Sequence, residues 1–295
     1  MGPVIPTSGV TRRAADLPHD TSGSDAPLDY PLITVITATY NAADELPGLI
    51  ASLRQQLDRK FDWIVVDGAS SDATLEILRA SSDVLTYFIS EPDFGFYHAL
   101  NKAILCVKTK YYLVMGADDR LDPDTIRLFC EAATSSGADI VATAVNVNGR
   151  IVLPGKGQPW RRGASAYISQ HSVGTLIRTK LHDRVGAYSN QFPIAADSYF
   201  IKKAIATSGV KVEYTNFVAG SFATGGISSK DLLLALTDLY RIQMLTEHTP
   251  ILQTMLFAWN MMKSFPRIIG YLKKGRICDH RQKHHVANGQ TDHGA

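Results

Sequence analysis

The sequence has few cysteines, and they form no pattern. Its 295 residues include only Cys106, Cys130 and Cys278, which lie far apart without a CxxC pair. This spacing argues against a disulfide framework and against a zinc cluster. We therefore expect a protein of a reducing, cytoplasmic compartment.

An excess of charge of one sign is also lacking, since 30 basic and 28 acidic residues give a formal net charge of +2 at pH 7. With 45% hydrophobic and 20% charged residues, the composition excludes collagen-like, coiled-coil and wholly disordered chains. Residues 263–283 hold seven basic residues and one acidic residue. Because this charge lies in one C-terminal segment and does not line the predicted fold, nucleic-acid binding is not expected.

The order of the apolar runs predicts an α/β fold. Residues 1–30 lack apolar periodicity and the apolar core of a signal peptide, so we expect a flexible N-terminal tail. Beyond them, helical spacing of leucines alternates with short apolar runs. Strands are predicted at residues 32–39, 61–67, 84–90, 111–115 and 139–145. This alternation favours a Rossmann-like, mainly parallel central sheet with helices on both faces.

The pattern becomes more irregular after residue 145. The Asn148-Gly149 pair predicts a type I′ hairpin, Asp197 stands at a predicted helix start, and residues 210–222 predict a strand. The Gly225-Gly226 pair interrupts the chain before a helix expected near Ser229. Loop-rich segments of this kind often shape a binding cleft.

Polar side chains follow four of the predicted strands at the point where each strand ends. In open parallel sheets, ligands bind at the carboxyl ends of the strands, so we expect a nucleotide-like ligand at this rim. The rim residues are Tyr40 and Asn41 after the first strand, Asp67 after the second, Glu91 and Asp93 after the third, and Asp118 and Asp119 after the fourth.

The sequence MGADD, which ends in Asp118 and Asp119, follows an apolar strand directly. Adjacent carboxylates repel each other, and a divalent cation carrying a diphosphate would relieve that repulsion and neutralise the leaving phosphate. The alternative is a solvated turn in which these acids are structural.

The other rim residues also allow two interpretations. Asp67 precedes Gly68, where the chain can turn sharply, so its carboxylate can accept from a base or a ribose, or it can cap the next helix. Tyr40 can stack on a base or belong to the core. Asn101 and Lys102 can reach a sugar or a phosphate, or form a solvated helix face.

Several motifs, in this order and at this spacing, resemble the nucleotide-binding half of an inverting family 2 glycosyltransferase of GT-A fold. They are ITATYNA, VVDGASSDAT, SEPDFGFYHALNKAI and MGADD. Gln170-His171-Ser172, residues 194–200 and Gly225-Gly226 are similar to the bacterial branch that builds colanic acid and related exopolysaccharides. The resemblance implies a GT-A domain at residues 31–249, with a nucleotide-sugar-binding half (31–145) and an acceptor half (146–249).

The resemblance also implies roles for single residues. Asp67 would bind the base, Asp118 the ribose or the sugar, and Asp119 a Mg²⁺ or Mn²⁺ ion on the donor diphosphate. Asp197 matches the position of the catalytic base, which deprotonates the acceptor hydroxyl, and His171 would lie near the acceptor or the diphosphate. The remaining donor-site residues would be Thr39, Tyr40, Asn41, Asp93, Asn101 and Lys102. Without the resemblance, Asp197 can equally be a helix N-cap and His171 a loop histidine.

The implied enzyme transfers a sugar from a nucleoside-diphosphate sugar to a growing glycan, on a polyprenyl-diphosphate carrier, in cell-surface polysaccharide biosynthesis. Two residues depart from the pattern of the branch. His98 replaces an acid and can change donor choice or the response to pH, and Ala103 replaces a glycine and is expected only to tighten packing.

Three other classes of protein fit the sequence less well. A sugar-phosphate nucleotidyltransferase needs a Gly-rich, basic loop after the first strand, but residues 39–45 are acidic and hold no Gly, Lys or Arg. A dinucleotide oxidoreductase needs GxGxxG at the same turn, where it is absent. A non-catalytic scaffold of the same fold would be expected to lose Asp119 or Asp197.

The segment 250–295 is expected to lie on the cytoplasmic face of a membrane without crossing it. Apolar residues recur at three- and four-residue intervals between residues 252 and 272, but Lys263 and Arg267 interrupt them. The basic residues that follow would be attracted to an anionic surface. The alternative is that the apolar residues pack on the catalytic domain.

Overall fold

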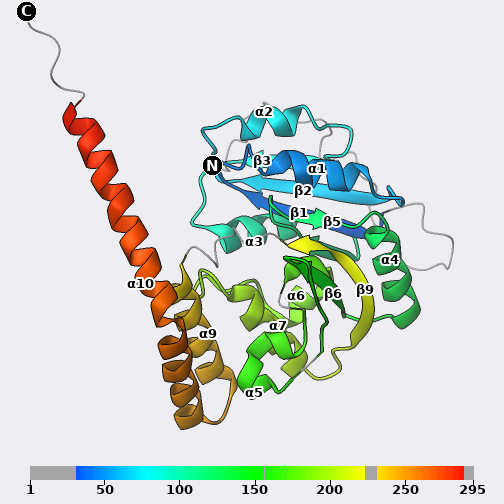
Figure 1. The fold of residues 1–295 in the computed structure, drawn as a ribbon. Coiled ribbons are helices and arrows are strands. Elements are labelled where there is room, and N and C mark those ends of the chain that lie inside the picture. The colour runs from blue at the N-terminus through cyan, green and yellow to red at the C-terminus, as the bar shows by residue number, and fades with distance from the viewer. Residues whose placement is uncertain (1–30, 156, 170, 223–230, 289–295) are drawn as a thin grey trace, which may run out of the picture. The chain divides into compact units, whose positions relative to one another are not determined.

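The computed structural model describes residues 31–155, 157–169, 171–222 and 231–288, with the side chains of Arg267 and of residues 271–288 left out. The N-terminal tail, Gln170 and the Gly225-Gly226 break lie outside the described residues. The chain divides into two compact units, Met1–Lys230 and Asp231–Ala295. Figure 1 shows both units, and each is described here by itself.

The first part of unit 1 alternates strands and helices as the sequence predicts. Strands β1 to β4 form the parallel order β3-β2-β1-β4, in which Thr39 of β1 is level with Asp67 of β2 and Asp67 with Ser90 of β3. The carboxyl ends of these strands therefore meet at one edge. The elements are β1 (Ile33–Thr39), α1 (Leu46–Arg54), β2 (Phe61–Asp67), α2 (Thr74–Arg79), β3 (Tyr87–Ser90), α3 (Phe96–Cys106) and β4 (Tyr111–Val114).

Helices cover both faces of this part of the sheet. Figure 1 shows α1 and α2 on one side of β1 and β2, and α3 on the other. On the first side, Leu49 of α1 belongs to a buried cluster with Val35 of β1 and Trp63 of β2. On the other side, α3 buries Leu100 and Ala103, the residue that replaces the usual glycine. The strands are apolar along most of their length because both faces are covered.

The second part of unit 1 makes the sheet mixed, where the sequence analysis expected a mainly parallel one. Strand β8 pairs antiparallel with β4 and β6, β9 pairs parallel with β6, and β5 pairs antiparallel with β9. The described strands form one nine-stranded sheet, with β7 beside β6. The elements are β5 (Arg120–Leu121), α4 (Thr125–Ser136), β6 (Ile140–Val147), β7 (Arg150–Val152), α5 (Pro159–Arg162), the 3₁₀ turns Gly163–Ala166, Ser172–Gly174 and Thr179–Leu181, β8 (Thr175–Arg178), α6 (His182–Val185), α7 (Ala196–Ala206) and β9 (Val212–Phe222).

Two strands, β5 and β8, are not predicted by the sequence pattern because they are short. β5 has two residues, and β8 has four, between 3₁₀ turns, so neither carries a periodic pattern. The predicted hairpin between β6 and β7 is confirmed. Asn148 and Gly149 at its tip both have positive φ, 51° and 82°, as a type I′ turn requires.

Unit 2 consists of α9 (Leu232–Thr246) and α10 (Pro250–Asn288). The Tyr240 ring of α9 stacks on Phe257 of α10, with ring centres 4.5 Å apart, and its hydroxyl lies 3.0 Å from the Thr254 hydroxyl. Among the described residues, no helix has the length and apolar character needed to cross a membrane. The predicted boundary between the GT-A domain (31–249) and the C-terminal segment (250–295) falls between α9 and α10. This domain division stays a prediction.

Candidate active site

The loop after β4 buries one of its two adjacent carboxylates. Asp119 is 1% exposed, and its Oδ2 accepts from the backbone N–H of Gly116 at 2.7 Å. Its Oδ1 is buried without a hydrogen-bond partner among the described residues. Burial raises the pKa of Asp119 to about 7, and the neighbouring Asp118 charge adds to this shift, while the Gly116 N–H opposes it. Asp118 is half-buried.

Gly116 and Arg120 fix the shape of this loop. A β-carbon on Gly116 would lie 2.8 Å from Asp118 Oδ1 and 3.1 Å from Asp119 Oδ2, so a larger residue would displace both carboxylates. Arg120 Nη1 donates to the carbonyl of Asp119 at 2.6 Å, and Nη2 donates to that of Glu45 at 3.2 Å. The Arg120 side chain thus joins this loop to Glu45, the N-cap residue of α1.

The donor set fits a divalent cation. A buried carboxylate oxygen without a partner costs free energy unless a cation or another group satisfies it, and hard cations such as Mg²⁺ and Mn²⁺ take oxygen ligands. The described residues contain no group of three or more His, Cys, Asp or Glu side chains that could hold a metal. Asp118 and Asp119 therefore suit a cation that completes its coordination with substrate phosphates and water.

Asp67 ties three strand ends together. It is fully buried, and its two carboxylate oxygens accept hydrogen bonds from the hydroxyls of Thr39, Ser70 and Ser90 and from the Ser70 N–H. These four bonds use the acceptor sites that a carboxylate offers. A direct contact with a nucleotide base stays a prediction, and it would require one of these hydroxyls to turn away.

Tyr40, Asn41 and Asp93 lie at the same edge. Tyr40 is 68% exposed, as a base-stacking residue must be before its ligand arrives. Asn41 has a φ of 48° and accepts from the Ser71 N–H at 2.9 Å, which joins the loops after β1 and β2. A β-carbon on Gly68 would lie 2.8 Å from Asp93 Oδ2 and 3.4 Å from the Tyr40 ring. Tyr40 and Asp93 therefore both approach the bend that follows Asp67.

The polar groups of Asn101 and Lys102 on α3 contact other parts of the protein. The Asn101 amide exchanges two hydrogen bonds with the backbone of Tyr188, at 2.9 and 3.0 Å. Lys102 forms an ion pair with Glu91 at 2.7 Å and donates to the Pro92 carbonyl at 3.2 Å. These contacts join α3 to the loop before it and to the segment that follows α6, and direct binding of the donor by the two residues stays a prediction.

Asp197 lies in the first turn of α7 and lines a small cavity. The N-cap of α7 is Ala195, so Asp197 does not have the capping position that the sequence left open. Its Oδ1 accepts from the Tyr97 hydroxyl at 2.8 Å and from the Ser198 N–H at 2.7 Å. Burial raises the pKa of Asp197, and the Tyr97 hydrogen bond opposes that rise. The cavity, of about 40 Å³, is also lined by Ser172 and Thr175.

His171 comes directly before Ser172, on the rim of the acceptor half. Its ring stacks on Phe222, the last residue of β9, and its Nδ1 is buried without a hydrogen-bond partner among the described residues. Burial lowers the pKa of His171 to about 4, so the ring is neutral at pH 7. His98, which departs from the family pattern together with Ala103, accepts from the Phe94 N–H through Nδ1 at 3.3 Å.

Residues 34–206 match the model of glycosyl transferase family 2. The chain belongs to this family. The family 2 chain is 27% identical over 180 residues to an uncharacterized glycosyltransferase of Mycobacterium tuberculosis, covering 59% of this chain and 69% of the relative. It is 24% identical over 212 residues to a PGL/p-HBAD biosynthesis glycosyltransferase of Mycobacterium bovis, covering 68% and 80%. It is 30% identical over 118 residues to the succinoglycan biosynthesis protein ExoO of Rhizobium meliloti, covering 40% and 34%.

Solved structures of glycosyltransferases share the fold. TarS of S. aureus superposes with a TM-score of 0.56 at 18% identity, over 79% of this chain and 43% of TarS. The mannosyltransferase PcManGT of Pyrobaculum calidifontis, in complex with GDP-Man and Mn²⁺, gives 0.57 at 17% identity, over 90% and 84%. The GT-A α/β fold of this family 2 glycosyltransferase is thereby confirmed.

Two residues of the site were missed by the sequence analysis. The Tyr97 hydroxyl contacts Asp197, and the Arg120 side chain joins the carbonyl of Asp119 to that of Glu45, so both link segments far apart in the chain. Only Arg120 directly follows a predicted site residue. Nothing in the sequence assigned their partners.

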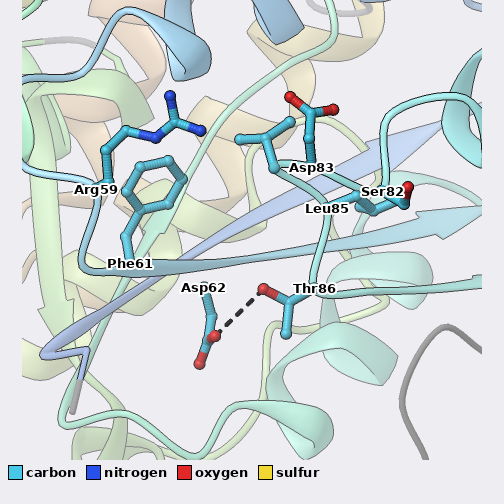
Figure 2. Close-up of a pocket in the computed structure, with 8 residues that line it drawn as sticks. Arg59, Phe61, Asp62, Ser82, Asp83, Leu85 and Thr86 are labelled. Atoms are coloured by element: carbon cyan, nitrogen blue, oxygen red, sulfur yellow. Dashed lines mark hydrogen bonds between the residues drawn. The ribbon is translucent and has the colours of Figure 1, made fainter.

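A second, larger cavity of this family 2 protein lies at the other end of β2 from Asp67. Figure 2 shows Arg59, Phe61 and Asp83 around it, with Asp62 hydrogen-bonded to the Thr86 hydroxyl at 3.2 Å. Its volume is about 330 Å³, and none of the predicted site residues lines it. The predicted carboxylates lie at the opposite edge of the sheet.

Proposed function

We propose that this chain is an inverting, metal-dependent glycosyltransferase that moves a sugar from a nucleoside-diphosphate donor to a hydroxyl group of a glycan. The observation that carries the proposal is the buried Asp119, whose Oδ1 has no partner among the described residues, beside Asp118 at the end of β4. Such a carboxylate is suited to a cation that binds a diphosphate. Relatives support this class of donor, because TarS has been solved with UDP and with UDP-GlcNAc.

In the proposed reaction, Asp119 would hold Mg²⁺ or Mn²⁺, which when bound neutralises charge on the leaving diphosphate, and Asp118 would bind the ribose or the sugar. Asp197 is the general base that takes the proton of the acceptor hydroxyl as its oxygen attacks the anomeric carbon. The bond from that carbon to the diphosphate oxygen breaks on the opposite face, so the configuration inverts. His171, being neutral, can hydrogen-bond the acceptor or the diphosphate.

We further infer that the product belongs to cell-surface polysaccharide biosynthesis, with a polyprenyl-diphosphate-linked acceptor. The support comes from relatives whose names place them in succinoglycan and in PGL/p-HBAD biosynthesis. The link to the colanic acid branch rests on the motifs of the acceptor half.

We also propose that unit 2 docks peripherally on the cytoplasmic face of the plasma membrane. Five apolar side chains of α10 recur every three or four residues, and each is more than half exposed. They are Ile251, Met255, Trp259, Met262 and Phe265. A helix with such a stripe and nearby basic residues suits an anionic lipid surface, where a lipid-linked acceptor would also be found.

A screen of UDP- and GDP-sugars for hydrolysis and transfer, with and without Mn²⁺, tests the proposed activity. We expect metal-dependent release of a nucleoside diphosphate from one class of donor, and loss of release in Asp119→Ala. A nucleotidyltransferase would instead release pyrophosphate when given a nucleoside triphosphate and a sugar phosphate. A scaffold would show neither reaction, and either result would overturn the proposal.

A further inference from the structure

The hydroxyl group of Tyr97 has two acceptors within reach and one proton to donate. It lies 2.8 Å from Asp197 Oδ1 and 3.0 Å from the backbone carbonyl oxygen of Ile194. Tyr97 is 6% exposed, so bulk water has little access to make up for an acceptor that loses its donor. The protonation state of Asp197 decides which acceptor receives the Tyr97 hydrogen bond, because an ionised carboxylate binds a donor more strongly than a carbonyl group does.

The two oxygens of Asp197 are not equivalent. The Tyr97 hydroxyl and the Ser198 N–H both donate to Oδ1, and neither bond uses Oδ2. Because both of these donors stabilise charge on Oδ1, Oδ2 is the oxygen that we expect to take a proton from a substrate.

We propose that Tyr97 is a positioning residue whose hydroxyl donates to Asp197 Oδ1 while Asp197 is ionised, and turns to the Ile194 carbonyl when Oδ2 has taken the acceptor's proton. This inference rests on the proposed function of Asp197 as the base. In the step, the acceptor oxygen forms a bond to the anomeric carbon and its proton moves to Oδ2. The bond to the diphosphate breaks, and the diphosphate leaves with the electron pair. Tyr97 keeps its own proton and changes only its acceptor.

The surroundings suit this role. Burial alone would favour the protonated form of Asp197, and the Tyr97 hydrogen bond counteracts it by lowering the pKa of the carboxyl. Tyr97 itself stays neutral, because burial and the nearby Asp197 raise its pKa well above the usual value. The residue can thus donate throughout the working pH range.

Two other titratable side chains near α7 have their hydrogen bonds with groups other than Asp197. The ring of His182 on α6 contacts Phe200, with its Nδ1 at Gly186 O and its Nε2 at the Tyr112 hydroxyl. Lys203 on α7 donates to the Val185 carbonyl. The 3₁₀ turn Gly163–Ala166 has no titratable group. Two titratable rings nearby contact other rings: Tyr188 contacts Tyr97, and His171 stacks on Phe222. The remaining titratable groups are the exposed Asp183 and Arg184 of α6 and Tyr199 and Lys202 of α7.

The test is the pH dependence of kcat/KM in Tyr97→Phe, which keeps the ring and removes the hydroxyl. Without the donor, the pKa of Asp197 rises, so the acid limb of the profile should move up by about one pH unit. KM for the donor should change little, because Tyr97 acts on the base. Tyr112→Phe is the matched control: Tyr112 is also fully buried, and its hydroxyl bonds His182 and Tyr188 without contacting Asp197. It should lower the melting temperature to a similar extent without moving the acid limb.

Three outcomes separate this inference from the proposed function. Asp197→Asn should lose at least about 10²-fold in turnover, the usual scale for a general base. If Asp197→Asn keeps its activity, the base assignment fails and the role of Tyr97 fails with it. If Asp197→Asn is inactive but the acid limb is the same in wild type and Tyr97→Phe, or moves equally in Tyr112→Phe, only the role of Tyr97 is overturned.

A second variant covers the case in which Tyr97→Phe does not fold. Replacing Tyr97 alone with 3,5-difluorotyrosine keeps the shape and makes the hydroxyl a stronger donor to the ionised carboxylate. The acid limb should then move down, opposite to the shift in Tyr97→Phe. An unchanged limb would contradict the proposal.

Discussion

The guanidinium group of Arg120 occupies the space that a β-carbon on Gly48 would fill. Arg120 belongs to β5, and from this position against α1 its guanidinium group donates to the carbonyl oxygens of Ala117, Asp119 and Glu45. The glycine in α1 therefore allows an arginine to hold the loop that carries the paired carboxylates. Helix α1 thus contributes to the proposed cation site without supplying a ligand.

We expect Gly48→Ala to displace Arg120 and weaken Mn²⁺-dependent donor binding about fivefold, the scale of one hydrogen bond, without unfolding the protein. The alanine itself should stabilise α1 by roughly 1 kcal/mol. This gain opposes the loss of the Arg120 contact, so the melting temperature should change little. Calorimetric titration of the donor measures the effect. In an Arg120→Ala background the Gly48→Ala change should add nothing, and an additive loss would show that the contact is not the cause.

The pKa of Asp119 predicts an unusual dependence of stability on pH in the metal-free protein. Its folded pKa is about 7, above the value of about 3.9 for an unfolded aspartate. The folded state therefore binds the extra proton between these values, and the free energy of unfolding falls as the pH rises from about 4 to about 7. Asp119→Asn should raise the melting temperature at pH 8 and leave it nearly unchanged at pH 4.

Asp124→Asn is the control for this experiment, because a hydrogen bond from Arg127 lowers the pKa of Asp124. Its stabilising effect is present at high pH and is lost as the pH falls through that lowered pKa. Asp124→Asn should therefore be less stable than the wild type at pH 8. Equal melting temperatures of Asp119→Asn and wild type at pH 8 would argue against the burial of an ionised Asp119.

Asp118 and Asp119 should differ in what they do for the donor. Asp119→Ala removes the buried ligand, so we expect it to abolish transfer and to make donor binding independent of Mn²⁺. Asp118→Ala should mainly weaken donor binding, since this half-buried carboxylate can face the ribose or the sugar. Donor binding with and without Mn²⁺ checks both. An Asp119→Ala protein with undiminished metal dependence would contradict the metal assignment.

The apolar stripe on α10 should mediate binding to anionic liposomes. Trp259→Glu places a charge in the stripe and should reduce flotation with the liposomes. Asn260→Glu adds the same charge at the next, also exposed position, outside the stripe, and should have a much smaller effect. High salt should weaken binding of all forms, because each nearby basic residue contributes roughly 1 kcal/mol of electrostatic attraction. Equal flotation of the two variants would argue for packing instead of membrane docking.

The sequence was sufficient to predict the first half of the sheet but not the second. β2 was predicted at its observed bounds, Phe61–Asp67, because a run of apolar residues buried on both faces is a strong signal. β5 and β8 depend on pairing with β9, β4 and β6, which lie far away in the chain, and a segment of two to four residues carries no such signal. The mixed sheet follows from these long-range pairings.

The candidate site divides in the same way. The positions of Asp119 and Asp197 at element ends could be read from local pattern. The hydroxyls that surround Asp67, and the bonds from Asn101 to Tyr188, come from side chains brought together only by folding. For this reason the sequence could name Asp67 and Asn101 but could not show that their polar atoms already have partners inside the protein.

Strand β9 belongs to both halves of unit 1. It comes from the acceptor half but pairs with β6 and β5 of the nucleotide-sugar-binding half, where Gly220 lets the backbones of β9 and β5 cross closely. Its last residue stacks on His171. Within the described residues, the two halves thus share one hydrogen-bonded sheet, which disfavours a hinge motion between them. On the proposed function, we expect substrates to enter through movements of loops, and acceptor preference to diverge during evolution by loop replacement while the sheet keeps its geometry.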